Sequence, residues 1–146
     1  MSVELPFAPV DEIIRRSAGD LRVSSGAAEA LASRIQREGA ERAVVAAERA
    51  ETDGRKTLMV ADFDAESTPP TEELALPIAP VDRVARLDID DRYRVSMDAR
   101  VALAAQLESH ADDIAAVATR LAHHAGRRTI KAEDIETYDE LESHFQ

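Results

Sequence analysis

The segment DGRKTLMVADF at residues 53–63 occurs again as AGRRTIKAEDI at residues 125–135, so that Gly54 and Gly126 lie 72 residues apart. Upstream, LPFAPVDEIIRR from Leu5 matches LPIAPVDRVARL from Leu76, 71 residues later. One additional residue in the second copy, just before its RVS segment, accounts for the different spacing. Self-similarity at a fixed spacing indicates a repeat. The chain therefore contains two copies of one unit.

Each copy predicts a short helix, a long central helix and a terminal helix. Prolines open the first helix, and a glycine follows the central helix where a C-terminal cap belongs. Ser24 and Ser96 precede the central helices as N-cap residues. A two-residue extended stretch separates each glycine from the terminal helix. The expected ranges of the first and central helices are 10–18 and 25–53 in the first copy, and 81–87 and 97–125 in the second.

The central helices carry a narrow stripe of small apolar residues, mainly alanine, at spacings of three and four. Such a stripe cannot build a core with one short helix on either side, so one copy alone is expected to be unstable. We expect the central helices to cross near their middles and to share one core. The first copy occupies residues 1–66 and the second 76–146, with a linker at 67–75 whose prolines shorten the first copy's terminal helix.

The charge is strongly acidic, with 29 acidic and 18 basic residues and a net charge of −11. Only Lys56 and Lys131 are lysines, and the other basic residues are arginines. This composition favours a protein adapted to a salt-rich cytoplasm over an ordinary acidic protein. Cysteine is absent, which excludes disulfides and thiolate metal sites. No signal peptide or membrane-length apolar run is found, so we expect a soluble, intracellular protein.

The order of elements, with the LP-[FI]-AP, RVS and G-R-[KR]-T-[LI] motifs, resembles the archaeal histones. Two copies in one chain resemble the tandem histones of salt-loving archaea, and the resemblance covers nearly all of both halves. It implies an all-α fold of two tandem histone folds in an intramolecular handshake, equivalent to a histone dimer. It also implies a chromosome-associated protein that wraps double-stranded DNA through phosphate and minor-groove contacts and needs no cofactor.

In a handshake, the first loop of one copy lies beside the second loop of the other copy. The resemblance then implies that Arg22 and Arg94 enter the minor groove and that loop residues beside them contact phosphates. The first helices would complete an arc of about 30 base pairs, with Glu12 standing where the second copy has Arg83. The alternative for these arginines is a solvated surface. The expected DNA-binding residues are Arg15, Arg16, Arg22, Lys56, Thr57, Arg83, Arg86, Arg94, Arg128 and Thr129.

Two further sets of residues have structural roles by resemblance. The first loop arginine of each copy pairs with the aspartate seven residues later, which gives the pairs Arg55 with Asp62 and Arg127 with Asp134; DNA contact is the alternative. The second copy retains an association surface made of Leu121, His124 and Asp134. We therefore expect at most two chains to associate, back to back through their second copies.

Catalytic and metal-binding patterns are not found in the sequence. His123 and His124 are adjacent on a helix and point in different directions, so no metal site is expected. Phosphate-binding and hydrolase motifs are also absent, which argues against an enzyme. Two functions remain open. One is sequence-tolerant DNA bending or wrapping that influences transcription, and the other is a histone-fold module or regulator with protein partners and weak or site-limited DNA binding.

Overall fold

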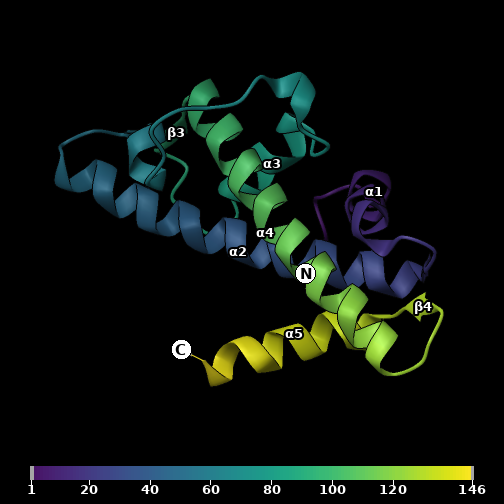
Figure 1. Cartoon of the computed structure of the whole chain (residues 1–146). Helices are drawn as coiled ribbons and strands as arrows, with labels where there is room; N and C mark the ends of the chain where they lie inside the picture. The colour runs from purple at the N-terminus through teal and green to yellow at the C-terminus, as the bar shows by residue number, and fades with distance from the viewer. Residues whose placement is uncertain (1, 146) are drawn as a thin grey trace. The chain divides into compact units, whose positions relative to one another are not determined.

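The computed structural model describes residues 2–145 and consists of helices joined by loops, of which the connection between η1 and α3 is long (Figure 1). The all-α fold with two copies of a short–long–short helix pattern is confirmed. The only strands in the described residues are two-residue segments in the loops. The elements are α1 (Phe7–Ala18), β1 (Arg22–Val23), α2 (Ser25–Thr52), β2 (Thr57–Leu58), η1 (Val60–Phe63), η2 (Thr71–Glu73), α3 (Ile78–Ala85), β3 (Arg94–Val95), α4 (Met97–His124), β4 (Thr129–Ile130) and α5 (Ala132–His144).

The first helix of each copy begins three residues earlier than predicted, at Phe7 and Ile78. The prolines of the AP motif lie inside the first turn and not before it. They are tolerated there because first-turn amides have no acceptor within the helix. The second of these helices also ends earlier than predicted, because Leu87 donates its amide hydrogen to Val84 and closes a turn.

The long helices begin and end as predicted, to within one residue. The Ser24 hydroxyl accepts a hydrogen bond from the Ala27 amide at 3.0 Å, and Ser96 accepts one from Ala99 at 3.1 Å. Both serines are therefore N-caps. At the other end, Gly54 and Gly126 adopt φ angles of 73° and 72°. Glycine reaches this left-handed region without strain, which allows the chain to leave the helix.

The terminal helices differ in length, as predicted, but the first one ends before the linker prolines are reached. In the first copy η1 is a single 3-10 turn that ends at Asp64, whose φ is 58°. In the second copy α5 has 13 residues. Within residues 2–145 no helix is long and apolar enough to cross a membrane.

The chain forms two compact units, and each unit contains segments of both copies. Unit 1 comprises Gln36–Glu108 with the N-terminal residues up to Leu5, and unit 2 comprises Pro6–Ile35 with the residues from Ser109 onward. A parallel ribbon lies in each unit: β2 pairs with β3 in unit 1, and β1 pairs with β4 in unit 2. Each ribbon joins the first loop of one copy to the second loop of the other, which confirms the predicted loop pairing.

The core of each unit is filled by aliphatic side chains from both copies. Unit 1 buries Leu58, Val84 and Leu103, and unit 2 buries Ile14, Ile114 and Ile130, along with many alanines. In unit 1, α2 and α4 approach closely at Gly39. A Cβ atom at this position would lie only 2.8 Å from Val84 Cγ1 and 2.9 Å from Leu107 Cδ1. A small residue at mid-helix is therefore required for this packing.

Candidate nucleic-acid interface

The β1–β4 ribbon brings Arg22 next to the second loop of the other copy. The Arg22 amide donates to the Arg128 carbonyl at 2.8 Å, and the Ser24 amide donates to the Ile130 carbonyl at 3.0 Å. Arg22 lies opposite Thr129 in the register. The side chains of Arg22 and Arg128 are exposed. The ribbon thus holds two cations at fixed backbone positions on the surface of unit 2.

The β2–β3 ribbon of unit 1 repeats this geometry. The Arg94 amide donates to the Lys56 carbonyl at 2.8 Å, and the Ser96 amide donates to the Leu58 carbonyl at 3.1 Å. Thr57 lies opposite Arg94. Arg94 and Lys56 are exposed. Both ribbons therefore present an arginine from one loop beside a cation from the other.

Free positive charge is concentrated at these ribbons. Within residues 2–145, a small group of basic side chains makes no hydrogen bond or ion pair, namely Arg22, Lys56, Arg94, Arg120, Arg128 and Lys131. Lys131 directly follows β4, and only Arg120 lies away from a ribbon. An anion can therefore bind these ribbon cations without displacing a carboxylate from them.

The arginines of the first helices are held differently, because each contacts a carboxylate within its own unit. The pairs are Arg15 with Asp11 at 2.6 Å, Arg16 with Asp112 at 3.1 Å, Arg83 with Glu4 at 3.3 Å and Arg86 with Asp82 at 3.1 Å. These arginine side chains remain 40–57% exposed, and exposed pairs are weak. A phosphate that binds them has to compete with the carboxylate already present. Glu12 on α1 is exposed and adds negative charge to this surface.

Arg55 and Asp62 form a brace beneath the β2–β3 ribbon. Arg55 donates to both Asp62 carboxylate oxygens, at 2.8 and 2.9 Å, and to the Thr57 carbonyl at 2.8 Å. The Met59 amide donates to the same carboxylate at 2.7 Å. The hydrogen bonds from Arg55 hold the pKa of Asp62 below its usual value, although burial opposes this. Asp62 is only 4% exposed, so the pair fixes the loop from inside.

Arg127 and Asp134 form the matching brace in unit 2. Arg127 donates to the two carboxylate oxygens at 2.5 and 2.8 Å and to the Thr129 carbonyl at 2.9 Å. The Lys131 amide donates to Asp134 at 2.8 Å. Burial raises the pKa of Asp134, but the hydrogen bonds from Arg127 and Lys131 outweigh it, and the pKa is lowered overall. Both loop arginines therefore use their hydrogen-bond donors to hold their own loop in place.

The residues predicted for chain–chain association lie near the end of α4 and the start of α5. Leu121 is partly buried and His124 is exposed, whereas Asp134 is 2% exposed and bound to Arg127. The first copy has Arg49 at the place of Leu121. Arg49 donates to the Asp62 carbonyl at 2.9 Å and pairs with Asp64 at 3.1 Å.

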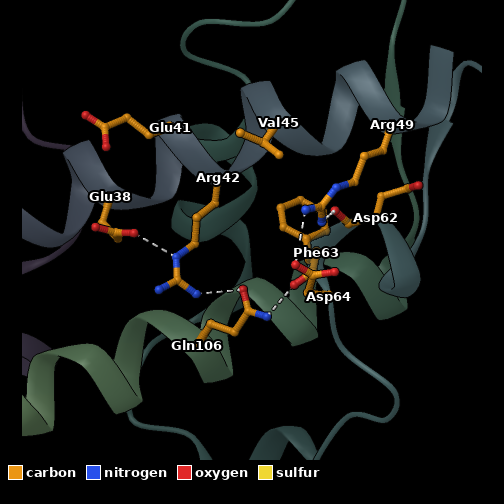
Figure 2. Close-up of a pocket in the computed structure, with 9 residues that line it drawn as sticks. All are labelled: Glu38, Glu41, Arg42, Val45, Arg49, Asp62, Phe63, Asp64 and Gln106. Carbon is orange, nitrogen blue, oxygen red and sulfur yellow. Dashed lines mark hydrogen bonds and ion pairs between the residues drawn. The ribbon is translucent and has the colours of Figure 1, made fainter. Parts of the chain in front are cut away.

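Two features of unit 1 were not predicted from the sequence. One is a hollow of about 480 Å³ beside α2, where charged residues largely satisfy one another (Figure 2). Arg42 contacts Glu38 and Gln106 there, at 2.9 and 3.0 Å. The other is a cluster of Glu51, Arg92 and Tyr93 next to the β2–β3 ribbon. Its signal in the sequence is the lengthened loop of the second copy, which carries Arg92 and Tyr93. No group of histidine and carboxylate side chains suited to a metal ion occurs in the part of the chain that the structure describes.

Two copies of a short–long–short helical unit, each donating a loop to a ribbon with the other, define a histone-fold pseudodimer. The family model described as histone-like transcription factor (CBF/NF-Y) and archaeal histone matches residues 3–65 and again residues 74–137. The chain belongs to this family. Membership implies a DNA-binding chromatin protein and not an enzyme.

Individual relatives agree with this assignment. One subunit of the archaeal histone HAN1 from Thermococcus zilligii is 52% identical over 60 residues, which cover 41% of this chain and 87% of that protein. The crystal structure of the histone from Methanopyrus kandleri superposes with a TM-score of 0.63 at 24% identity, covering 90% of this chain and 91% of that one. A crystal structure from Thermus thermophilus superposes with a TM-score of 0.71 at 17% identity, covering 98% and 99%. At these identities, the two structures support the fold alone.

Proposed function

We propose that this protein bends or wraps double-stranded DNA with little sequence preference, and thereby influences chromatin architecture and transcription. The observation that carries the proposal is the concentration of unpaired cations at the two ribbons, while most other basic side chains are bound within the protein. Such a protein is associated with the nucleoid. Both braces support the proposal, because they keep the ribbons rigid before DNA arrives.

The ribbons supply the binding chemistry. Lys56 and Arg128 contact phosphates, with the Thr57 and Thr129 hydroxyls as further donors, and Arg22 and Arg94 insert into the minor groove. Arginines inserted in this way need no base-specific hydrogen bonds, because they respond to the width and the negative potential of the groove. Selectivity then comes from how easily a given sequence bends.

The first helices have a secondary role in this proposal. Each of their arginines already faces a carboxylate whose charge opposes a phosphate, so each gains less from DNA than an unpaired cation does. These arginines are Arg15, Arg16, Arg83 and Arg86. DNA contact at these helices follows contact at the ribbons and strengthens it.

The acidic net charge of the protein supports a second candidate function. About six phosphate contacts give a salt slope near −5, so raising salt from about 0.1 M to 2 M weakens binding by roughly seven decades. The net charge of −11 and the neutralised first helices therefore fit a regulator that binds proteins, or that meets DNA only at easily bent sites. In a salt-rich cytoplasm, the same carboxylates hold water and cations.

Fluorescence anisotropy with a labelled duplex of about 60 base pairs tests the proposal. Wild type, an Arg22→Ala/Arg94→Ala variant and a control are titrated between 0.1 and 3 M KCl. The control, Arg42→Ala/Arg120→Ala, removes the same charge at positions that contact neither ribbon nor brace. A steep salt slope that only the ribbon variant reduces supports DNA binding at the ribbons. No binding by folded wild-type protein at the lowest salt refutes it and favours a protein partner.

We also propose that two chains associate back to back through their second copies, using Leu121 and His124. The first copy lacks this surface, because Arg49 is tied to Asp62 and Asp64. Sedimentation of wild type and a Leu121→Glu variant on DNA provides the test. We expect two chains that the substitution separates, and a long regular polymer contradicts the proposal.

A further inference from the structure

The β2–β3 ribbon has an arginine beside it that the β1–β4 ribbon lacks. Arg92 precedes the buried Tyr93, whose hydroxyl donates to the Glu51 carboxylate. Arg92 Nη2 donates to the same carboxylate at 2.8 Å and to the Tyr93 hydroxyl at 3.1 Å. Its Cζ atom lies 5.0 Å from the centroid of the Tyr93 ring, within the range of a cation–π contact. Three contacts thus hold the guanidinium in one place.

Arg92 still has donors to offer. A guanidinium carries five N–H donors, and within residues 2–145 only Nη2 of Arg92 makes hydrogen bonds. Its side chain is 51% exposed. Arg92 and Lys56 line the same hollow of about 200 Å³ next to the ribbon. Either Nη1 or Nε can therefore donate to an anion while Nη2 stays on Glu51.

We propose that Arg92 is a third phosphate-binding cation of the β2–β3 ribbon, held in position by Glu51 and Tyr93. This inference rests on the proposed DNA binding and deepens it. Glu51 has two opposing effects: it orients Arg92, and its charge repels a phosphate. The hydrogen bond from Tyr93 and the charge of Arg92 lower the pKa of Glu51, so this carboxylate stays ionised.

The corresponding positions beside the β1–β4 ribbon carry other residues, so the Arg92 cluster occurs in unit 1 alone among the two units. At a spacing of 72 residues, Asp20 stands in place of Arg92 and His123 in place of Glu51. There the additional unpaired cation is Lys131, where the first copy has Met59. The two ribbons thus carry their additional cation at different positions.

The salt dependence of DNA binding by the full chain tests this assignment. Each phosphate contact contributes about 0.9 to the slope of log K against log salt. Arg92→Ala is therefore expected to reduce the slope by about 0.9 and to weaken binding about eightfold at 0.1 M KCl, but only about twofold at 0.5 M. Arg120→Ala is the matched control, because it removes one exposed arginine that lies away from both ribbons and, within the described residues, makes no hydrogen bond or ion pair. A slope for Arg92→Ala that equals the slope of this control overturns the assignment.

A second pair of variants separates phosphate contact from simple bracing of the loop. If Arg92 binds phosphate, Glu51→Gln binds DNA at least as tightly as its control Glu48→Gln, because the repelling charge is gone. If Arg92 only braces the loop through Glu51, Glu51→Gln weakens binding as Arg92→Ala does, and the assignment is wrong. Failure of wild type to bind removes the proposed function as well. Loss of binding in Arg22→Ala/Arg94→Ala without any effect of Arg92→Ala refutes the role of Arg92 alone.

Discussion

Asp134 is the residue whose removal tests most directly whether the loop arginines brace the ribbons. Its carboxylate is 2% exposed and accepts two hydrogen bonds from Arg127 and one from the Lys131 amide. Asp134→Ala removes all three bonds and leaves a guanidinium without its buried partner. Breaking a fully buried pair costs about 3–5 kcal/mol. Because water and Glu133, at 3.6 Å, can partly compensate Arg127, we expect a loss of about 2.5 kcal/mol for Asp134→Ala.

The corresponding change in melting temperature follows from the size of the chain. An unfolding entropy of about 2.1 cal/mol/K per residue over 146 residues gives about 0.3 kcal/mol/K. A loss of about 2.5 kcal/mol then lowers Tm by about 8 °C. Circular dichroism melting at one fixed KCl concentration measures this shift.

Arg128→Ala is the control for this experiment, because Arg128 is the exposed, unpaired neighbour of Arg127. Its Tm is expected to stay within about 2 °C of wild type, while DNA binding weakens. A shift of less than about 2 °C for Asp134→Ala, or an equal shift for Arg128→Ala, refutes the division between bracing and DNA-contacting cations.

Further predictions concern pH, packing, the repeat and salt. The pKa values of Asp62 and Asp134 are lowered in the folded state. Their contribution to the free energy of unfolding is therefore present above pH about 4 and is lost as the pH falls through the lowered values. Acid titration followed by circular dichroism should show a smaller loss of stability in the Asp62→Asn/Asp134→Asn variant than in wild type. Gly39→Ala places a methyl group against Val84 and Leu107 and should destabilise by about 1–3 kcal/mol in urea unfolding; a neutral result argues against the close approach. Residues 1–66 expressed alone should lack a cooperative melting transition, because each compact unit draws on both copies. Stability should rise steeply from dilute buffer to molar KCl, and equal melting temperatures at both ends of that range contradict adaptation to salt.

The repeat made most of the fold predictable, because each local signal occurred twice. The serine caps and capping glycines set the long helices to within one residue. The starts of the first helices were placed three residues late, because proline fits both before a helix and inside its first turn, and sequence alone does not separate the two. The sequence also did not show which arginines lack a carboxylate partner. Arg16 finds Asp112 and Arg83 finds Glu4 far along the chain, and such long-range pairs have no periodic signal.

Fusion of the two copies has a physical consequence for the interface. In a dimer of identical chains, any substitution appears in both ribbons. Here each ribbon takes its first loop from one copy and its second loop from the other, so a change in one loop alters one ribbon only. Arg92 and Lys131 illustrate this, since each stands beside a single ribbon and its counterpart is Asp20 or Met59. The backbone pairing and the buried brace, which hold each ribbon together, are the same in both units. The charge around each ribbon therefore differs between the two units while the supporting frame is the same, and under the proposed DNA binding the two ribbons are expected to bind with different strength.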